Sequence, residues 1–137
     1  MEELLLQLKR HEGLRLSAYQ DSLGYWTIGY GRMIDKRKGG GISVEEAEVL
    51  LKNDIERIDK ILGEVLREEP VRRAVIVNMV FQMGFGAVRG FKGMWAAITK
   101  NDWETAAREG LDSRWAQQTP GRARELMEQL RTGKWKG

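Results

Sequence analysis

The stretch EGLRLSAYQDSLGYWTIGYG, residues 12–31, joins the end of a helix to a small hairpin. Leucines upstream of it recur at helical spacing, and Gly13 can adopt the left-handed conformation that ends a helix, so we predict a helix over residues 2–12. LSAYQD and YWTIGY carry the aromatic and β-branched residues of two short strands. SLG between them is typical of a hairpin turn, with Gly24 at positive φ. The sequence therefore predicts a helix followed by an antiparallel hairpin.

A three-residue turn fixes the register of this hairpin. Asp21 then pairs with Tyr25, and Tyr19 pairs with Thr27. Asp21 and Thr27 consequently lie on one face of the hairpin as diagonal neighbours. The prediction depends on loop length, because a change of one residue would move the two side chains to opposite faces.

The rest of the chain is predicted to be helical. Ser43 and Glu46 form a capping-box signature at the start of a long amphipathic helix over residues 44–62. The run VRRAVIVNMVFQM, residues 71–83, is apolar on nearly all sides, as in a helix buried inside a bundle, and Gly84 can end it. Shorter helices are predicted over residues 90–99, over 103–111 with Asp102 as cap, and over 120–131.

These elements predict one α+β domain, mostly α-helical, over residues 1–137. A small lobe with the hairpin, about residues 13–42, is joined by the long helix to a helical lobe. That lobe comprises about residues 64–137 together with the N-terminal helix. We expect a cleft between the two lobes, with the end of the first helix delivering Glu12 into it.

Composition narrows the possible chemistry. The chain has 137 residues and no cysteine, which excludes disulfides and thiol catalysis, and its single histidine argues against a zinc site. The net charge of +3 suits an anionic partner such as a bacterial wall or nucleic acid, and equally suits an ordinary solvated surface. MEELLLQLKR opens with acids, unlike a secretory signal, and no run of about 20 apolar residues predicts a membrane span.

Two acids and a hydroxyl are the candidate catalytic groups. Glu12 falls at the negative end of a helix, which favours the protonated form that a general acid needs. Asp21, on the hairpin rim, is expected to stay ionised, and Thr27 beside it offers a hydroxyl for a water. Glycoside hydrolysis uses such a pair of carboxyl groups. On spacing alone, ordinary structural roles for a helix-end acid and a turn aspartate are the commoner interpretation.

The same stretch, with RRAVIVNMVFQMG and SRWAQQTPGRARELMEQLRTGKW, resembles the T-even-type phage lysozymes, endolysins that cut bacterial peptidoglycan. The resemblance covers almost the whole chain in order. It implies a two-lobed lysozyme fold and an inverting muramidase that hydrolyses the β-1,4 bond between N-acetylmuramic acid and N-acetylglucosamine. It implies Glu12 as general acid, with Asp21 and Thr27 positioning the water. No cofactor or metal is implied, and we expect a monomer whose partner is peptidoglycan, without nucleic acid or stable membrane association.

The resemblance also implies supporting positions. Those matching the substrate cleft are Gly31, Met33 and Phe81. Those matching its support are Gln82 and Trp115 behind the cleft, Arg122 as the partner of Glu12, and Arg32 with Asp54 as an ion pair.

Three departures from the family accompany these matches. Arg32 replaces a histidine, which removes a group that titrates near neutral pH. The segment RMIDKRKGGGI is shorter than in the family, so we expect a third strand to be reduced to a loop. Met94 and Glu109 replace polar side chains that contact sugar.

Other functions remain open at this point. A lytic transglycosylase needs only one glutamate, although Asp21 favours hydrolysis, and a non-catalytic peptidoglycan-binding module would need neither acid. Zinc amidases and cysteine peptidases require histidine or cysteine sets that the chain lacks. A nucleic-acid binder would need a basic helix face, and none is present. Without a signal, an endolysin is expected in the host cytoplasm until another factor opens the membrane to the wall.

Overall fold

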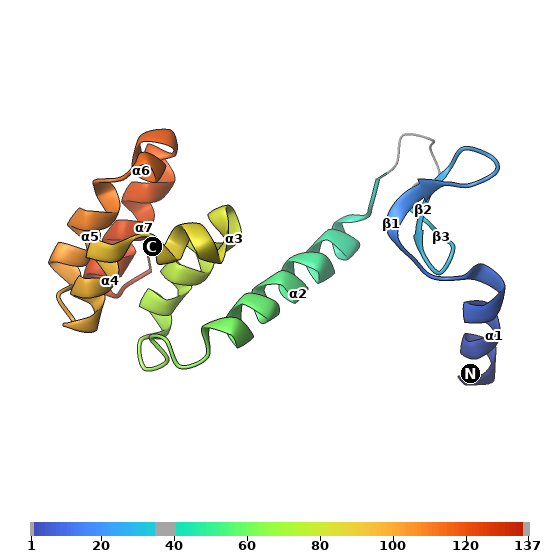
Figure 1. Cartoon of the computed structure of the whole chain (residues 1–137), viewed down its shortest axis with the longest axis horizontal. Helices are drawn as coiled ribbons and strands as arrows, with labels where there is room; N and C mark the ends of the chain where they lie inside the picture. The colour runs from blue at the N-terminus through green and yellow to red at the C-terminus, as the bar shows by residue number, and fades with distance from the viewer. Residues whose placement is uncertain (1, 35–40, 136–137) are drawn as a thin grey trace. The chain divides into compact units, whose positions relative to one another are not determined.

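The computed structural model describes residues 2–34 and 41–135 (Figure 1). Contacts divide the chain into two units, Met1–Leu51 and Lys52–Gly137, which we describe separately. Most of the shortened segment, residues 35–40, lies outside the described part. The predicted attachment of the N-terminal helix to the helical lobe concerns the placement of the two units and stays a prediction.

The first unit opens with α1 (Glu2–Glu12), at the predicted bounds. Gly13 ends it with φ of 71°, and its N–H donates to the carbonyl of Lys9 at 3.0 Å. A three-stranded antiparallel sheet follows in the order β1-β2-β3, formed by β1 (Arg15–Gln20), β2 (Trp26–Gly29) and β3 (Arg32–Met33).

The third strand was expected to be a loop, and this expectation is wrong. Thr27 pairs with Met33 and Ile28 pairs with Arg32, so two residues of β3 still add to the sheet. Although the segment after the β2–β3 turn is short, its first two residues are therefore enough to form a strand against β2. β2 is consequently the central strand, with a neighbour on each side.

The register of the first hairpin is confirmed. Tyr19 lies opposite Thr27, and the N–H of Asp21 donates to the carbonyl of Tyr25 at 2.8 Å. Gly24 closes the turn at φ of 87°, a conformation that favours glycine. Asp21 and Thr27 therefore project from the same face of the hairpin.

α2 (Val44–Leu62) begins in the first unit and continues into the second. Its capping box is formed in both directions: the N–H of Glu46 donates to Ser43 Oγ at 3.1 Å, and the N–H of Ser43 donates to Glu46 Oε1 at 3.3 Å. At the other end, the Arg73 guanidinium donates to the carbonyl of Gly63 at 2.9 Å and to Asp59 Oδ1 at 2.7 Å. The arginine therefore satisfies acceptors that the end of α2 leaves free.

The second unit is a helical bundle with a continuous core. Its further helices are α3 (Pro70–Arg89), α4 (Lys92–Thr99), α5 (Trp103–Leu111), α6 (Arg114–Gln118) and α7 (Pro120–Thr132). Ile76, Met79 and Leu130 are fully buried in the core. Asp102 caps α5 as predicted, because its side chain accepts from the N–H of Thr105. The bundle therefore has the packed interior that the apolar run 71–83 predicts.

Two details of this bundle differ from expectation. Gly84, at φ of 87° and ψ of 162°, interrupts α3 instead of ending it, and helical structure resumes to Arg89. α6 was not predicted, and it begins where Ser113 Oγ accepts from the N–H of Ala116 at 3.1 Å.

α3 is long and apolar enough to cross a membrane by length and composition. Five of its side chains are buried in the core of the second unit, namely Val75, Ile76, Met79, Val80 and Val88. Burial of this kind is typical of the central helix of a bundle.

Candidate active site

Glu12 is the last residue of α1, and its side chain lies against Gly31 in the turn between β2 and β3. A methyl group placed on Gly31 would stand 2.5 Å from Glu12 Oε2 and 3.0 Å from its Cδ. Gly31 also has φ of +71°, which side chains rarely adopt. Glycine is therefore required at position 31 both for its backbone conformation and for the approach of the Glu12 carboxyl group.

Asp21 lies in the other turn of the sheet, between β1 and β2. Its Oδ1 accepts hydrogen bonds from the N–H groups of Leu23 and Tyr25, both at 2.9 Å. The side chain thus has the structural role of a turn aspartate, which was the alternative interpretation from sequence. Among the described residues its second oxygen, Oδ2, makes no hydrogen bond, so the turn orients the carboxylate and leaves one oxygen for a water.

Thr27 lies on the central strand and is only 4% exposed. Its Oγ1 donates to the carbonyl of Tyr25 at 3.1 Å. Because that bond uses the single hydroxyl proton, the remaining capacity of Oγ1 is to accept. Met33, the expected substrate contact, lies opposite Thr27 on β3 and is 46% exposed. The structure therefore collects Glu12, Gly31, Asp21, Thr27 and Met33 in one unit.

Arg32 and Asp54 each form an ion pair within their own unit, and their expected pairing across the two units stays a prediction. Arg32 Nη2 lies 2.8 Å from Glu46 Oε2, and Arg57 Nη2 lies 3.0 Å from Asp54 Oδ1. Glu46 is in the first turn of α2, where the capping box already orients it, and Arg57 is one helical turn along from Asp54. The backbone hydrogen bond from Ser43 and the guanidinium of Arg32 lower the pKa of Glu46 below its usual value.

Arg122, expected to pair with Glu12, belongs to the second unit. Its Nε and Nη2 donate to Asn78 Oδ1 at 3.0 and 2.6 Å. Asn78 therefore holds one edge of the guanidinium. The pairing of Arg122 with Glu12 joins residues of different units and stays a prediction.

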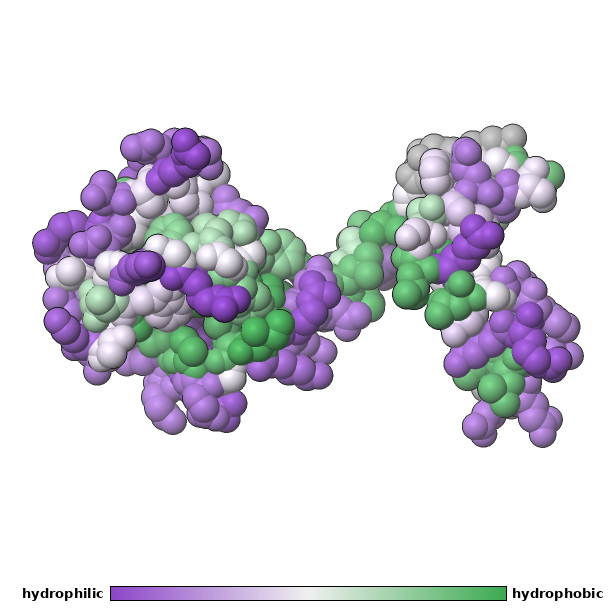
Figure 2. Space-filling view, in the orientation of Figure 1, coloured by the Kyte–Doolittle hydropathy of each residue, from purple (hydrophilic) through white to green (hydrophobic). Residues whose placement is uncertain are grey.

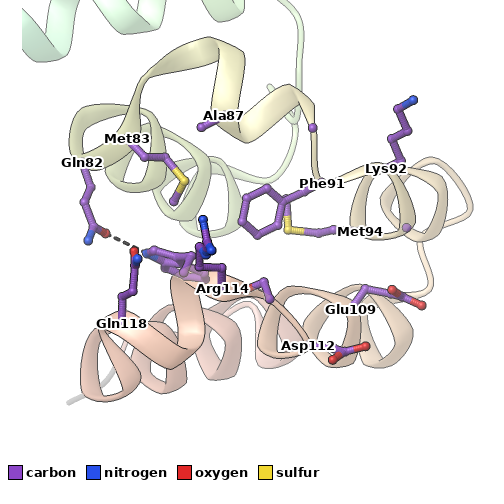
Figure 3. Close-up of a pocket in the computed structure, with 14 residues that line it drawn as sticks. Gln82, Met83, Ala87, Phe91, Lys92, Met94, Glu109, Asp112, Arg114 and Gln118 are labelled. Atoms are coloured by element: carbon purple, nitrogen blue, oxygen red, sulfur yellow. Dashed lines mark hydrogen bonds between the residues drawn. The ribbon is translucent and has the colours of Figure 1, made fainter.

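A pocket of about 700 Å³ opens within the second unit (Figure 3). Figure 3 shows Phe91 and Met94 in its middle, Glu109 and Asp112 toward one end and Gln82 toward the other. Its lining residues are Gln82, Met83, Ala87, Gly90, Phe91, Lys92, Gly93, Met94, Glu109, Asp112, Ser113, Arg114, Trp115 and Gln118.

Four residues singled out from sequence border this pocket. Met94 and Glu109 line it, and so do Gln82 and Trp115, which are joined by a hydrogen bond of 2.8 Å from Trp115 Nε1 to Gln82 Oε1. Trp115 also packs against the edge of Phe91, with ring centroids 6.0 Å apart. Phe81, the remaining expected cleft residue, is 47% exposed and lies outside the lining.

Several lining residues were missed from sequence. Phe91 and Asp112 come from short connections, Lys92 from the start of α4, and Arg114 and Gln118 from α6. The available signal was Ser113, a residue type that favours helix caps and would have placed Asp112 and Arg114 at a helix start. Asn78, the partner of Arg122, had no sequence signal, since it lies within an otherwise apolar helix.

The profile of the phage lysozyme family matches residues 9–132. The chain belongs to the phage lysozyme family. It is 31% identical to probable T4-type lysozyme 1 of Dictyostelium discoideum over 92% of both chains. It is 36% identical to an endolysin of Acyrthosiphon pisum secondary endosymbiont phage 1 over 63% of this chain and 60% of that protein.

A longer protein matches as well. The chain is 36% identical to the pre-baseplate central spike protein Gp5 of Enterobacteria phage T4, over 92% of this chain and 27% of the spike protein, so it spans about a quarter of that relative. The matches to the spike protein and to the Dictyostelium lysozyme extend over 155 and 156 aligned positions. Since this chain has 137 residues, these relatives carry residues that this lysozyme lacks.

Proposed function

We propose that this lysozyme is an inverting muramidase that hydrolyses the β-1,4 bond between N-acetylmuramic acid and N-acetylglucosamine in peptidoglycan. The observation that carries the proposal is that Glu12, at the end of α1, lies against one turn of a small sheet while Asp21 lies in the other turn of that sheet. Glu12 lies against Gly31 in the β2–β3 turn, and Asp21 is oriented by two N–H groups in the β1–β2 turn. Family membership and the endolysin among the relatives support the same activity.

The proposed reaction uses each group once. Glu12 donates its proton to the bridging oxygen, which leaves with the N-acetylglucosamine as its O4 hydroxyl. A water attacks C1 of the N-acetylmuramic acid from the opposite face, and Asp21 takes a proton from it. Thr27 Oγ1, whose proton is engaged with the Tyr25 carbonyl, accepts a hydrogen bond from that water and orients it.

The spacing of the two turns supports inversion. They lie at opposite ends of β2, which has four residues, so their backbones stand about 13 Å apart at about 3.3 Å per residue. The proposal requires the two carboxyl groups to stand near these two turns with a water between them. Inverting enzymes need about 6.5–9.5 Å between these groups, whereas direct attack by a carboxylate needs about 5–5.5 Å.

The pocket of the second unit is proposed to bind a part of the substrate away from the reacting bond. An aromatic and thioether floor with polar ends suits a sugar ring or a peptide stem. Substitution of Glu109 by glutamine should then change KM more than kcat, because the interaction is the same in the ground state and the transition state. Unchanged KM and kcat for this variant on purified walls would remove the pocket from the proposal.

Two isosteric variants test the chemistry. Glu12→Gln removes the transferable proton and should lower wall lysis by about 10²–10⁴-fold. Asp21→Asn retains Oδ1 as the acceptor in the turn and removes the carboxylate, so activity should fall while the hairpin stays folded. Glu3→Gln, the same change at the start of α1, is the matched control and should retain activity. Full lysis by Glu12→Gln would refute the proposal.

One observation favours a second candidate, a lytic transglycosylase. Asp21 already has a structural reason to be present, since its Oδ1 holds the turn. A transglycosylase needs only the glutamate and forms an anhydro sugar in place of a reducing end. Mass spectra of the wall fragments distinguish the two, because an anhydro sugar is lighter than a reducing sugar by one water. Reducing products whose α-anomer appears first in proton NMR spectra support inverting hydrolysis, and anhydro products with full activity of Asp21→Asn support the second candidate.

A further inference from the structure

The last turn of α1 touches the β2–β3 turn at two neighbouring points. One is the contact of the Glu12 carboxyl group with Gly31. The other joins Lys9 to Tyr30, with the ammonium Nζ 5.5 Å from the centroid of the ring. Lys9 and Glu12 are three residues apart and share a face of the helix, while Tyr30 and Gly31 are adjacent in the turn.

Few other side-chain contacts among the described residues of the first unit hold α1 against the sheet. Among its described residues, α1 has no buried side chain, and Leu4, Leu5 and Leu8 are about half exposed or slightly less. The helix remains regular up to Glu12, because the N–H of Gly13 still donates to the carbonyl of Lys9 at 3.0 Å. Whatever fixes Lys9 on the sheet therefore also fixes the backbone from which the Glu12 side chain projects.

We propose that Lys9 and Tyr30 are positioning residues for Glu12. The proposal rests on Glu12 being the general acid. The face of an aromatic ring attracts an ammonium group, and at a partly exposed position such as Tyr30, 42% exposed, this contact is of moderate strength. Its effect is geometric: it holds the end of α1 at the rotation that brings the carboxyl group onto Gly31. Displacing a reacting group by about 1 Å is enough to lower a rate severely.

Neither residue takes part in the proposed proton transfers. The Lys9 ammonium is engaged with the ring, and the Tyr30 hydroxyl is not required for the contact, since the ring face makes it. The side-chain features that matter are consequently a positive charge at position 9 and an aromatic face at position 30. This gives a specific pattern of substitutions that succeed and fail.

The test compares substitutions that remove these features with substitutions that keep them. Lys9→Met retains the apolar stem without the charge, and Tyr30→Leu retains apolar bulk without the ring. Each should lower kcat for wall hydrolysis by about two- to fivefold with KM unchanged, the population change that such a contact can produce. The double variant should lose no more than the single variants, because both remove the same contact. Lys9→Arg and Tyr30→Phe should restore kcat.

A matched control uses a second cation–π contact among the described residues of this unit. Arg15 lies over the Tyr19 ring, with Cζ 4.6 Å from the centroid, and both partners of this contact belong to strand β1. Arg15→Met removes a contact of the same type and should leave kcat within about twofold of the parent chain. A loss equal to that of Lys9→Met would show that any surface cation–π contact matters here, and would overturn the specific role of Lys9 and Tyr30.

A spectroscopic readout separates positioning from activity. The ε-methylene protons of Lys9, next to the ammonium group that contacts the ring, should be shifted upfield in the NMR spectrum, and Tyr30→Leu should abolish this shift. Absence of the shift, unchanged kcat in Lys9→Met, or additive losses in the double variant would each overturn the inference. If Glu12→Gln abolishes lysis while Lys9→Met has full kcat, only this inference fails. If Glu12→Gln remains fully active, the proposed function fails.

Discussion

The two units of this lysozyme hold their shape by different means. All of the buried apolar side chains of the described chain lie between Ile58 and Leu130, in the second unit. In the described part of the first unit, Thr27 alone is buried. The geometry there is set by hydrogen bonds to Asp21, by the capping box of α2 and by glycines at positive φ such as Gly31.

Because of this difference, the residues that stabilise the fold and the candidate catalytic residues lie in different units. Figure 2 shows hydrophobic side chains among hydrophilic ones on the surface of α1. In the second unit, side chains of this kind are buried in the core. The candidate acids project from turns and a helix end, where their positions depend on backbone conformation. Changes in the second unit should therefore act mainly on the free energy of unfolding, and changes in the first unit mainly on catalytic geometry.

The largest expected effect tests the core of the second unit. Met79 on α3 is fully buried, so Met79→Ala should lower the free energy of unfolding by about 2–5 kcal/mol. Leu16 on β1 is 83% exposed, so Leu16→Ala should change it by no more than about 0.5 kcal/mol. Urea unfolding followed by far-UV circular dichroism measures both. Equal losses from the two variants would mean that the first unit has a core of its own.

The next effect tests whether backbone geometry controls the acid. Gly29 and Gly31 have φ of +70° and +71°, so alanine should strain the chain by about 1–2 kcal/mol at either position. A methyl group at position 29 meets nothing within 4 Å, whereas at position 31 it meets the Glu12 carboxyl group at 2.5 Å. Both variants should be destabilised alike. Only Gly31→Ala should lose activity strongly, by about 100-fold, because it displaces Glu12.

Gly29→Ala is thus the control for strain alone. Steady-state wall lysis under conditions where both variants are folded gives the comparison. Retained activity in both variants would contradict the approach of Glu12 to Gly31. Loss of activity in both would instead point to the β2–β3 turn as a whole.

Local signals explain what could be predicted of the fold. The bounds of α1 and the hairpin register followed from Gly13 and from the length of the SLG turn, which act on neighbouring residues. α6 was missed because it has only five residues, too few for a helical period to be visible. β3 was not predicted because it exists only through its pairing with β2, which the local sequence does not show.

The candidate residues could be named from the sequence, whereas most of their contacts could not. Residue types and the family resemblance pointed to Glu12, Asp21 and Thr27, and the structure places all three in the first unit. The contact of Arg32 with Glu46 was not predicted, because the approach of β3 to the first turn of α2 is a tertiary feature, and the pairing with Asp54 in the other unit stays a prediction. The pocket could not be predicted as a unit, since its lining comes from α3 to α6 and their connections.

The smallest expected effect compares one carboxyl group from each unit, Glu46 in the first and Asp102 in the second. Hydrogen bonds lower the pKa of both acids: those of Ser43 and of the Arg32 guanidinium lower the pKa of Glu46, and those of Thr105 lower the pKa of Asp102. Because each folded-state pKa lies below the unfolded value, the ionised group stabilises the fold above the unfolded pKa. That contribution is lost as pH falls through the folded pKa.

Glu46→Gln and Asp102→Asn retain the cap acceptors and remove the titration. Each variant should therefore lose less stability than the parent chain when the pH is lowered from about 7 to about 3, as measured by urea unfolding. The Glu46 side chain is 32% exposed and Asp102 is exposed, so solvent screens both groups and both effects should be much smaller than that of Met79→Ala. If unfolding of the packed bundle determines the measured free energy, Asp102→Asn should flatten the pH dependence more than Glu46→Gln. A larger effect from Glu46→Gln would place the capping box and its Arg32 pair within the cooperative core, and would remove the contrast between the two units.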